Sequence, residues 1–196
     1  SKLISQYCQL ILRRSFREPI AYILKEKEFW SKTFYVNRST LIPRPETELL
    51  VERIVKEFKK KKISILDIGT GSGCILISLI SEIKGSKGFG VDISKEAINV
   101  AKINSKKYGT NKRIKFVNSS FEEILHKKFD LVVANPPYIK SNDIKKLEID
   151  IKNFEPKIAL DGGNDGLDVI KKVIYKSKAI LKIKGMLALE IGNRQY

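Results

Sequence analysis

The chain has 196 residues, of which 42% are hydrophobic and 31% charged, and its formal net charge is +16. This size and composition suit one substantial globular domain plus a small appendage. There is no apolar run of membrane-spanning length, no signal-peptide layout and only two cysteines, Cys8 and Cys74. We therefore expect a cytoplasmic protein without a disulfide framework. With a lone histidine, His126, we also expect no metal site.

The excess of positive charge has two interpretations. It can indicate a polyanionic partner such as a nucleic acid. The lysines are scattered, however, and abundant Ile and Asn accompany them, so A/T-rich codons explain the same composition. Lys59–Lys62 forms a run, which is typical of a solvated helix end. Direct nucleic-acid binding thus stays open at this point.

The N-terminal part is predicted to be helical. Residues 1 to about 24 carry a short apolar stripe that indicates a packing face, and Pro19 ends this helix or begins another. The chain starts inside this pattern without Met, so we expect a piece of a longer or fused protein. Aromatic and β-forming residues from Phe29 to Val36 then predict one or two extended segments.

A stiff segment, Leu41–Glu48, follows, because its two prolines impose extended geometry. Pro45 or Thr47 opens a helix whose apolar stripe is Leu50, Val51, Ile54, Val55 and Phe58. Acidic residues in the first helical turn suit the helix dipole, which is a sufficient reason for Glu46 and Glu48. The sharper prediction is that Arg44 and Glu48 face a ligand.

From Lys62 onward strands and helices alternate. The predicted strands are 63–67, 88–92, 114–118, 129–134 and 185–191, and the predicted helices are 74–80, 95–108 and 166–181. This alternation predicts an α/β fold with a doubly wound, mostly parallel, Rossmann-like sheet. We divide the chain into a partial N-terminal helical domain (1–26), an extended linker or hairpin (27–45) and the main domain (46–196).

A glycine-rich turn, Gly69–Gly73, joins the first strand to its helix. The spacing is not that of dinucleotide-binding folds, and no Lys-Ser/Thr pair follows as in a phosphate-binding P-loop. Asp67, just before the turn, would repel a pyrophosphate but could accept from an ammonium group. Asp92 ends the second strand, where a carboxylate can bind a ribose diol. The alternative is that Asp92 caps the next helix together with Ser94.

A nucleoside with a cationic amino-acid tail and no phosphates fits this set, which points to S-adenosylmethionine. Phe121, just beyond the third strand, either walls the adenine ring or belongs to the core. At the end of the fourth strand comes Asn135-Pro136-Pro137-Tyr138. Prolines cannot continue the hydrogen-bond ladder, so the chain leaves the sheet in a stiff turn at the ligand-binding edge. An amide and an aromatic ring there suit a planar, nitrogen-bearing group.

These motifs together resemble class I S-adenosylmethionine-dependent methyltransferases that act on planar nitrogen: Asp67–Gly73, Val91-Asp92 and Asn135–Tyr138. Four flanking segments narrow the resemblance to the release factor glutamine N5-methyltransferases: Glu18–Leu24, Glu28–Trp30, Leu41–Glu48 and Phe154–Leu160. The resemblance runs from about residue 18 to residue 191. It implies that the main domain lacks the last helix and β-hairpin of the family fold.

The resemblance also implies the ligands. The methyl donor S-adenosylmethionine, which leaves as S-adenosylhomocysteine, would be bound by Asp67, Gly69, Thr70, Gly71, Ser72, Gly73, Asp92, Phe121 and Asn135. The substrate would be the glutamine of the Gly-Gly-Gln motif in class I peptide chain release factors, free or on the ribosome. It would be held by Arg44, Glu48, Asn135, Pro136, Pro137 and Tyr138. Ser120 stands where relatives often carry an acidic residue, which bears on how the adenine amino group is held.

For catalysis we expect Asn135 Oδ1 and the Pro136 carbonyl to accept the two N–H bonds of the glutamine amide, with Tyr138 packed on the amide plane. Two rivals stay open. An adenine N6-methyltransferase of DNA or RNA would use the same loop on a flipped base. A cofactor-binding module without catalysis is the other, since C-terminal elements of the family fold are missing.

Overall fold

The computed structural model describes residues 2–124 and 127–195, so His126 lies outside the described residues. Its helices are α1 (Lys2–Ser15), α2 (Ile20–Leu24), α3 (Thr47–Phe58), α4 (Cys74–Glu82), α5 (Lys95–Lys107), α6 (Ile149–Lys152) and α7 (Asp168–Ile180). Its strands are β1 (Glu26–Phe29), β2 (Lys32–Tyr35), β3 (Ser64–Ile68), β4 (Lys87–Asp92), β5 (Ile114–Asn118), β6 (Phe129–Ala134) and β7 (Leu181–Leu189). Single-turn helices are η1 (Phe121–Glu123) and η3 (Lys157–Ala159), and η2 (Ser141–Lys146) is longer.

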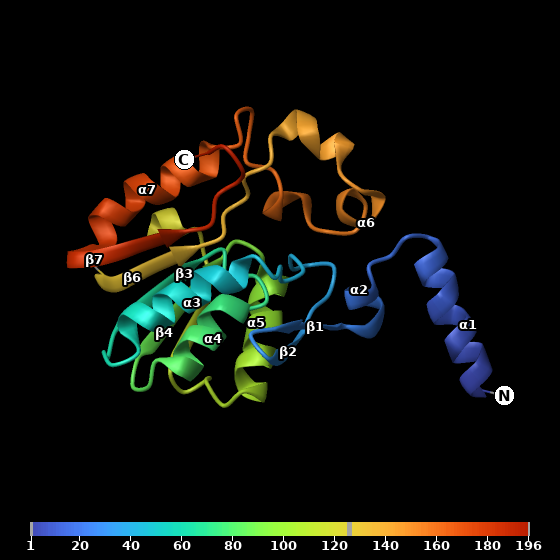
Figure 1. Ribbon diagram of the computed structural model, residues 1–196, viewed down its shortest axis with the longest axis horizontal. Coiled ribbons are helices and arrows are strands. Elements are labelled where there is room, and N and C mark those ends of the chain that lie inside the picture. Colours follow the sequence, from blue (N-terminus) through green and yellow to red (C-terminus); the bar gives the residue numbers. More distant parts are fainter. Residues whose placement is uncertain (1, 125–126, 196) are drawn as a thin grey trace.

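The main domain is built on a five-stranded sheet in the order β5-β4-β3-β6-β7. Every pairing in it is parallel, and helices cover both faces (Figure 1), which confirms the predicted fold class. The chain runs from β3 outward to β5 and then returns to place β6 on the other side of β3. This reversal is a topological switch point, where open α/β sheets bind ligands beyond the carboxyl ends of their strands.

Alternating strand residues face two separate cores. Ile65 and Leu131 point toward the layer formed by α3, α4 and α5, and Leu66 and Val132 point toward the layer that contains α7. Helix α4 is apolar on nearly all sides, and every residue from Cys74 to Ile80 is buried. This is the burial expected for a helix sandwiched between a sheet and other helices. Buried α4 thereby anchors one end of the glycine turn, and the central strand β3 precedes the other end.

The predicted extended segment 29–36 is part of an antiparallel hairpin, β1–β2. Its side chains Phe29 and Phe34 are fully buried in the core beneath α3 and α5. Asn104 of α5 accepts a hydrogen bond from the Tyr35 N–H at 2.8 Å and donates to the Tyr35 carbonyl at 2.9 Å. The same amide group donates to the carbonyl of Ser72 at 2.9 Å. One side chain therefore ties the hairpin to the glycine turn.

Three short helices, η2, α6 and η3, occupy the stretch between β6 and α7, for which the sequence predicted no element. This stretch arches over the carboxyl edge of the sheet toward the N-terminal helices (Figure 1). A parallel bridge between Ile139 and Asp161 closes its base. Strand β7 begins at Leu181 and not at the predicted Gly185. The prediction missed its first half because those residues are exposed and lysine-rich, without the apolar pattern of a buried strand.

Helix α1 stands apart from the sheet (Figure 1) and has no buried residue. Its predicted apolar stripe faces away from the described chain, with Leu3 77% and Ile4 64% exposed. Ion pairs attach it instead: Arg14 of α1 and Arg17, just after the helix, both bind Asp150 of α6, at 2.7 and 2.8 Å. Among the described residues, no helix is both long and apolar enough to cross a membrane.

Candidate active site

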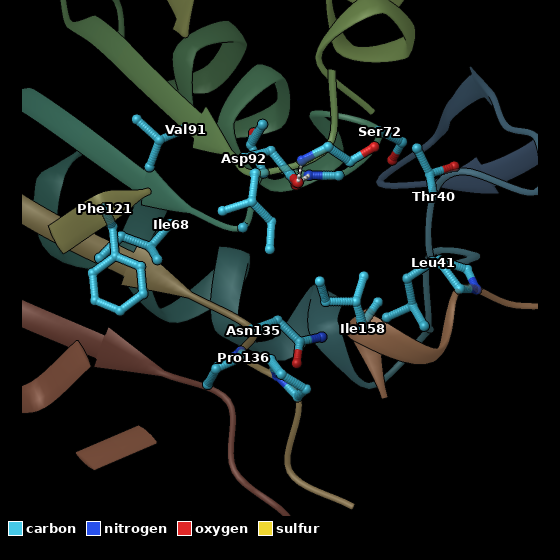
Figure 2. A pocket seen from close by; sticks show the side chains of 18 of the residues that line it. Thr40, Leu41, Ile68, Ser72, Val91, Asp92, Phe121, Asn135, Pro136 and Ile158 are labelled. Atoms are coloured by element: carbon cyan, nitrogen blue, oxygen red, sulfur yellow. Dashed lines mark hydrogen bonds between the residues drawn. The ribbon is translucent and has the colours of Figure 1, made fainter. Parts of the chain in front are cut away.

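A cavity of about 280 Å³ opens at the carboxyl ends of β3, β4 and β6. Figure 2 shows Asp92 and Ser72 on one side of it and Asn135 and Pro136 on the opposite side. The cavity lies at the switch point of the sheet, so residues far apart in sequence meet there. The predicted site residues that line it are Arg44, Gly69, Thr70, Gly71, Ser72, Asp92, Phe121, Asn135, Pro136 and Pro137.

The glycines of the turn serve two different purposes. Gly69 and Gly71 have φ of +68° and +54° and line the cavity. A Cβ on Gly69 would meet no heavy atom within 4 Å, so the backbone there is open to a ligand. Gly73 lies outside the cavity lining, with its α-carbon turned toward α5. A Cβ at that position would lie 2.9 Å from Ile77 Cδ1 and 3.2 Å from the Cβ of Ala101.

Asp67 is not among the residues that line the cavity. It is 1% exposed, and its Oδ2 accepts a hydrogen bond from the Thr70 hydroxyl at 2.6 Å, while Oδ1 has no partner among the described residues. Burial raises its pKa to about 7, against the hydrogen bond from Thr70. Strand alternation turns Asp67 to the α4 side, under the turn rather than beyond it. Direct contact of Asp67 with an ammonium group therefore stays a prediction, without support from the cavity lining.

Asp92 both organises the site and faces the cavity. Its Oδ2 accepts from the Gly71 N–H and its Oδ1 from the Ser94 N–H, both at 2.9 Å (Figure 2). Ser94 in turn caps α5 by accepting from the Ala97 N–H. Burial raises the pKa of Asp92, and the hydrogen bonds from backbone N–H groups oppose that rise. Each carboxylate oxygen has a second lone pair, so Asp92 can fix the turn and also accept from ligand hydroxyls.

Phe121 lies at the end of the cavity opposite Leu41, with its ring near Ile68 and Val91 (Figure 2). It is half-buried and packs against the core on the α7 side, so the two roles considered for it coincide. Its predecessor Ser120 also lines the cavity. The Ser120 hydroxyl accepts from the Glu122 N–H at 3.2 Å and thereby caps the N-terminus of η1. The ring can thus wall a planar group held in this part of the cavity.

The loop after β6 lines two cavities. The smaller one, of about 180 Å³, is also lined by Tyr138, Ile139 and Ile151 among others. The two cavities share six lining residues: Leu41, Arg44, Asn135, Pro136, Pro137 and Ala159. A group bound in the larger cavity and a group bound in the smaller one would therefore meet at the Asn135 amide and the Pro136 carbonyl.

Two polar residues that the sequence did not single out complete the loop's surroundings. Asn135 Nδ2 donates to Thr47 Oγ1 at 3.3 Å, and the Thr47 hydroxyl donates to Glu190 Oε2 at 2.6 Å. The Tyr138 hydroxyl donates to the other oxygen, Glu190 Oε1, at 3.4 Å. Burial, and then the charge of Glu190, raise the pKa of Tyr138. Glu190 directly follows β7. The predicted strand ran to residue 191 and placed Glu190 inside it, so a carboxylate at a strand end was not visible in the sequence.

Two of the four segments that narrowed the resemblance, Leu41–Glu48 and Phe154–Leu160, touch each other. Arg44 pairs with Glu155 at 2.5 Å, and the other Glu155 oxygen accepts from the Ile42 N–H at 3.1 Å. Glu155 is itself buried, so this contact fixes the wall of both cavities. Glu48 lines neither cavity: its Oε1 accepts from the Trp30 N–H at 2.9 Å. A ligand contact for Glu48 stays a prediction that this geometry does not support.

The residues present fit a nucleoside with a cationic tail. The turn offers open backbone, Asp92 offers a carboxylate for hydroxyl groups, and Phe121 offers an aromatic wall. The cationic groups of the lining, Arg44 and Lys172, do not lie in the glycine turn, where a phosphate would bind. Within residues 2–124 and 127–195 no three metal-ligating side chains gather.

Residues 59–189 match the methyltransferase domain family, and the chain belongs to that family. The release factor glutamine methyltransferase of Bradyrhizobium diazoefficiens is 42% identical over an alignment 196 residues long, and this alignment covers 98% of this chain and 65% of that protein. The one of Buchnera aphidicola is 45% identical, with 95% and 66% covered. A bifunctional methyltransferase of Rickettsia prowazekii is 41% identical, with 98% and 41% covered.

These relatives confirm the resemblance to release factor glutamine methyltransferases, and the chain spans about two thirds of their length or less. Solved structures agree on the fold. The hMettl16 catalytic domain has a TM-score of 0.66 at 19% identity, with 82% of this chain and 62% of that chain covered. A SAM-dependent methyltransferase from Agrobacterium tumefaciens has a TM-score of 0.60 at 15% identity, covering 87% and 53%. The family assignment supports S-adenosylmethionine, the cofactor expected from the sequence.

Proposed function

We propose that this domain transfers a methyl group from S-adenosylmethionine to the side-chain amide nitrogen of a glutamine in a class I peptide chain release factor. The observation that carries the proposal is the pair of cavities that share the Asn135–Pro137 loop. The larger cavity has the features that suit the methyl donor, and the smaller one is of a size for a side chain. The names of the relatives support glutamine in a release factor as the acceptor.

In this proposal, Asn135 and Pro136 hold the amide. Asn135 Oδ1 and the Pro136 carbonyl oxygen accept one amide N–H each, which orients the nitrogen toward the larger cavity. The lone pair of an amide nitrogen is delocalised into its carbonyl, so the ground state is a poor nucleophile. Two acceptors favour the more pyramidal, partly positive nitrogen of the transition state over the planar ground state. Tyr138 packs beside the amide, and Arg44, held by Glu155, lines the same cavity.

The bound donor supplies an activated methyl group on a sulfonium. Transfer of that methyl group to the amide nitrogen would leave the electron pair of the carbon–sulfur bond on the sulfur of S-adenosylhomocysteine. One amide proton becomes acidic once the nitrogen is cationic and then passes to solvent. The chain's contribution is therefore positioning and charge stabilisation, and no side chain has to remove a proton beforehand.

Tritiated S-adenosylmethionine offered with a class I release factor, with tRNA and with DNA tests this function. Label in the glutamine of the Gly-Gly-Gln motif supports the proposal, and a release factor with alanine at that glutamine is the matched control. Label in adenine of either nucleic acid would instead establish the adenine N6-methyltransferase. Binding of the donor without transfer to any of the three would establish a cofactor-binding module.

Asn135→Ala tests the central residue. We expect transfer to fall at least ~100-fold, since both an acceptor and its orienting effect are lost. Affinity for S-adenosylhomocysteine, measured by titration calorimetry, should stay within a few-fold, because the glycine turn and Asp92 are untouched. An Asn135→Ala variant that keeps full activity would contradict the assigned role.

A further inference from the structure

We propose that Glu190 and Thr47 are positioning residues that fix which end of the Asn135 amide faces the substrate. The proposal rests on the function above and adds how the Asn135 side-chain amide is oriented for that function. An Asn side chain is nearly symmetric in shape, yet its two ends are opposite in hydrogen bonding. The substrate amide needs an acceptor from Asn135, so only the orientation that presents Oδ1 is productive.

The direction of the hydrogen bonds follows from the chemistry of Glu190. An ionised carboxylate can only accept, so the 2.6 Å contact between Thr47 Oγ1 and Glu190 Oε2 places the single hydroxyl proton on the Glu190 side. Thr47 Oγ1 has no second proton to donate, so toward Asn135 it can only accept a hydrogen bond. That oxygen accepts from Asn135 Nδ2 at 3.3 Å. The carboxylate thereby sets the polarity of a chain of two hydrogen bonds.

Oδ1 of Asn135 is left available by this arrangement, and it accepts no hydrogen bond from any residue that the structure describes. With the amide turned over, its Oδ1 would face the Thr47 oxygen, whose proton is already given to Glu190. That reversed state loses one hydrogen bond and brings two acceptors together, which is unfavourable. The productive orientation is therefore favoured before any substrate arrives.

The three residues are held by independent elements. Thr47 is the first residue of α3 and is 2% exposed. Glu190 extends β7, where its N–H donates to the Ala134 carbonyl at 3.0 Å, directly before Asn135. The second carboxylate oxygen accepts from the Tyr138 hydroxyl. Glu190 thus accepts hydrogen bonds from both Thr47 and Tyr138, while it lines neither cavity itself.

The test uses the full chain with Thr47→Val and Glu190→Gln, which keep the shape of each side chain, and Thr47→Ser, which restores the hydroxyl. We expect kcat for release factor methylation to fall at least tenfold in the first two, with the affinity for S-adenosylhomocysteine within twofold of wild type. Thr47→Ser should recover most of the loss. The double variant should be no slower than the slower single variant, because both break one relay.

Glu82→Gln is the matched control. Glu82 is also a half-buried carboxylate that accepts a hydrogen bond, from Trp30 Nε1 at 3.3 Å, but it lines neither cavity. Its kcat should equal that of wild type. A similar loss in Glu82→Gln would show that the effect is one of general packing, and would overturn the relay.

A readout that needs no turnover separates this proposal from the proposed function. The side-chain amide signals of Asn135 in a ¹⁵N–¹H spectrum are assigned by their loss in Asn135→Ala. We expect them to shift and exchange faster with water in Thr47→Val and Glu190→Gln, and to return in Thr47→Ser. Unchanged signals overturn the relay whatever the kinetics, and so does unchanged kcat. If wild type transfers no methyl to a release factor, the proposed function fails and the spectrum alone decides the relay.

Discussion

Substituting Asp67 by Asn should change how the stability of this protein depends on pH. The Asp67 carboxyl is 1% exposed, and its pKa is raised from 3.8 to about 7, first by burial. An acid with a raised folded-state pKa stabilises the fold while it is protonated. That contribution is fully present below the pKa of the unfolded chain and is lost as the pH rises through about 7.

The magnitude follows from the shift. Between pH 5 and the folded-state pKa of about 7, an interval of about two pH units, Asp67 stays protonated in the folded protein while it is already ionised in the unfolded chain. At about 1.4 kcal/mol per unit, wild type should lose about 3 kcal/mol of unfolding free energy that Asp67→Asn does not lose. Asn can keep the Thr70 hydrogen bond through its oxygen. Its amide nitrogen then lies unpartnered, a cost that is the same at every pH.

Urea denaturation of both proteins across this pH range measures the effect. The free-energy difference between wild type and Asp67→Asn should change steadily in favour of the variant as the pH rises. Asp143→Asn is the control, because Asp143 lies near the surface and its pKa is lowered by the hydrogen bond from Lys146. A difference between wild type and Asp67→Asn that stays constant from pH 5 to pH 8 would refute the reasoning.

Two further substitutions test the glycine turn and its partner carboxylate. Asp92→Ala should weaken S-adenosylhomocysteine binding at least tenfold in calorimetry, because charge-assisted hydrogen bonds are worth about 1.5–3 kcal/mol each; unchanged affinity would remove Asp92 from the proposed site. Gly73→Ala should destabilise the fold by about 2–3 kcal/mol in urea, since φ is +79° and the new Cβ meets Ile77 and Ala101. Gly109→Ala, at φ +64° with nothing within 4 Å, should cost only about 1 kcal/mol, and equal losses would contradict the packing role.

Most of the residues that the sequence assigned to the site and the structure brings together lie at strand ends, and Arg44 is an exception. Asp92 ends a strand of the parallel sheet, Gly69, Gly71 and Asn135 closely follow one, and the topology of such a sheet gathers them at one edge. Strand periodicity and glycine spacing carry that information. The fold class was predictable for the same reason.

Spacing does not say which way a residue points. Asp67 and Gly73 belong to the same motif as Gly71, yet Asp67 faces the core under the turn and Gly73 faces α5. Thr47 and Glu190 were missed for a different reason. Thr47 reaches Asn135 from 88 residues away in the chain, and Glu190, 55 residues from Asn135, reaches it only through Thr47. Thr47 lies in a motif that was assigned to the site through Arg44 and Glu48, and Glu190 lies in no predicted motif. The three short helices after Tyr138 have too few residues to show a period.

The loop shared by the two cavities has a thermodynamic consequence. Because Asn135, Pro136 and Pro137 line both cavities, a ligand in one can change the affinity of the other cavity for its ligand. By thermodynamic linkage, the factor by which the first ligand changes the affinity for the second equals the factor in the reverse direction. The affinity for the demethylated donor and the affinity for the acceptor peptide are therefore not separate properties of this protein. Measuring either one with the other ligand present and absent gives the same coupling free energy, so two titrations check each other.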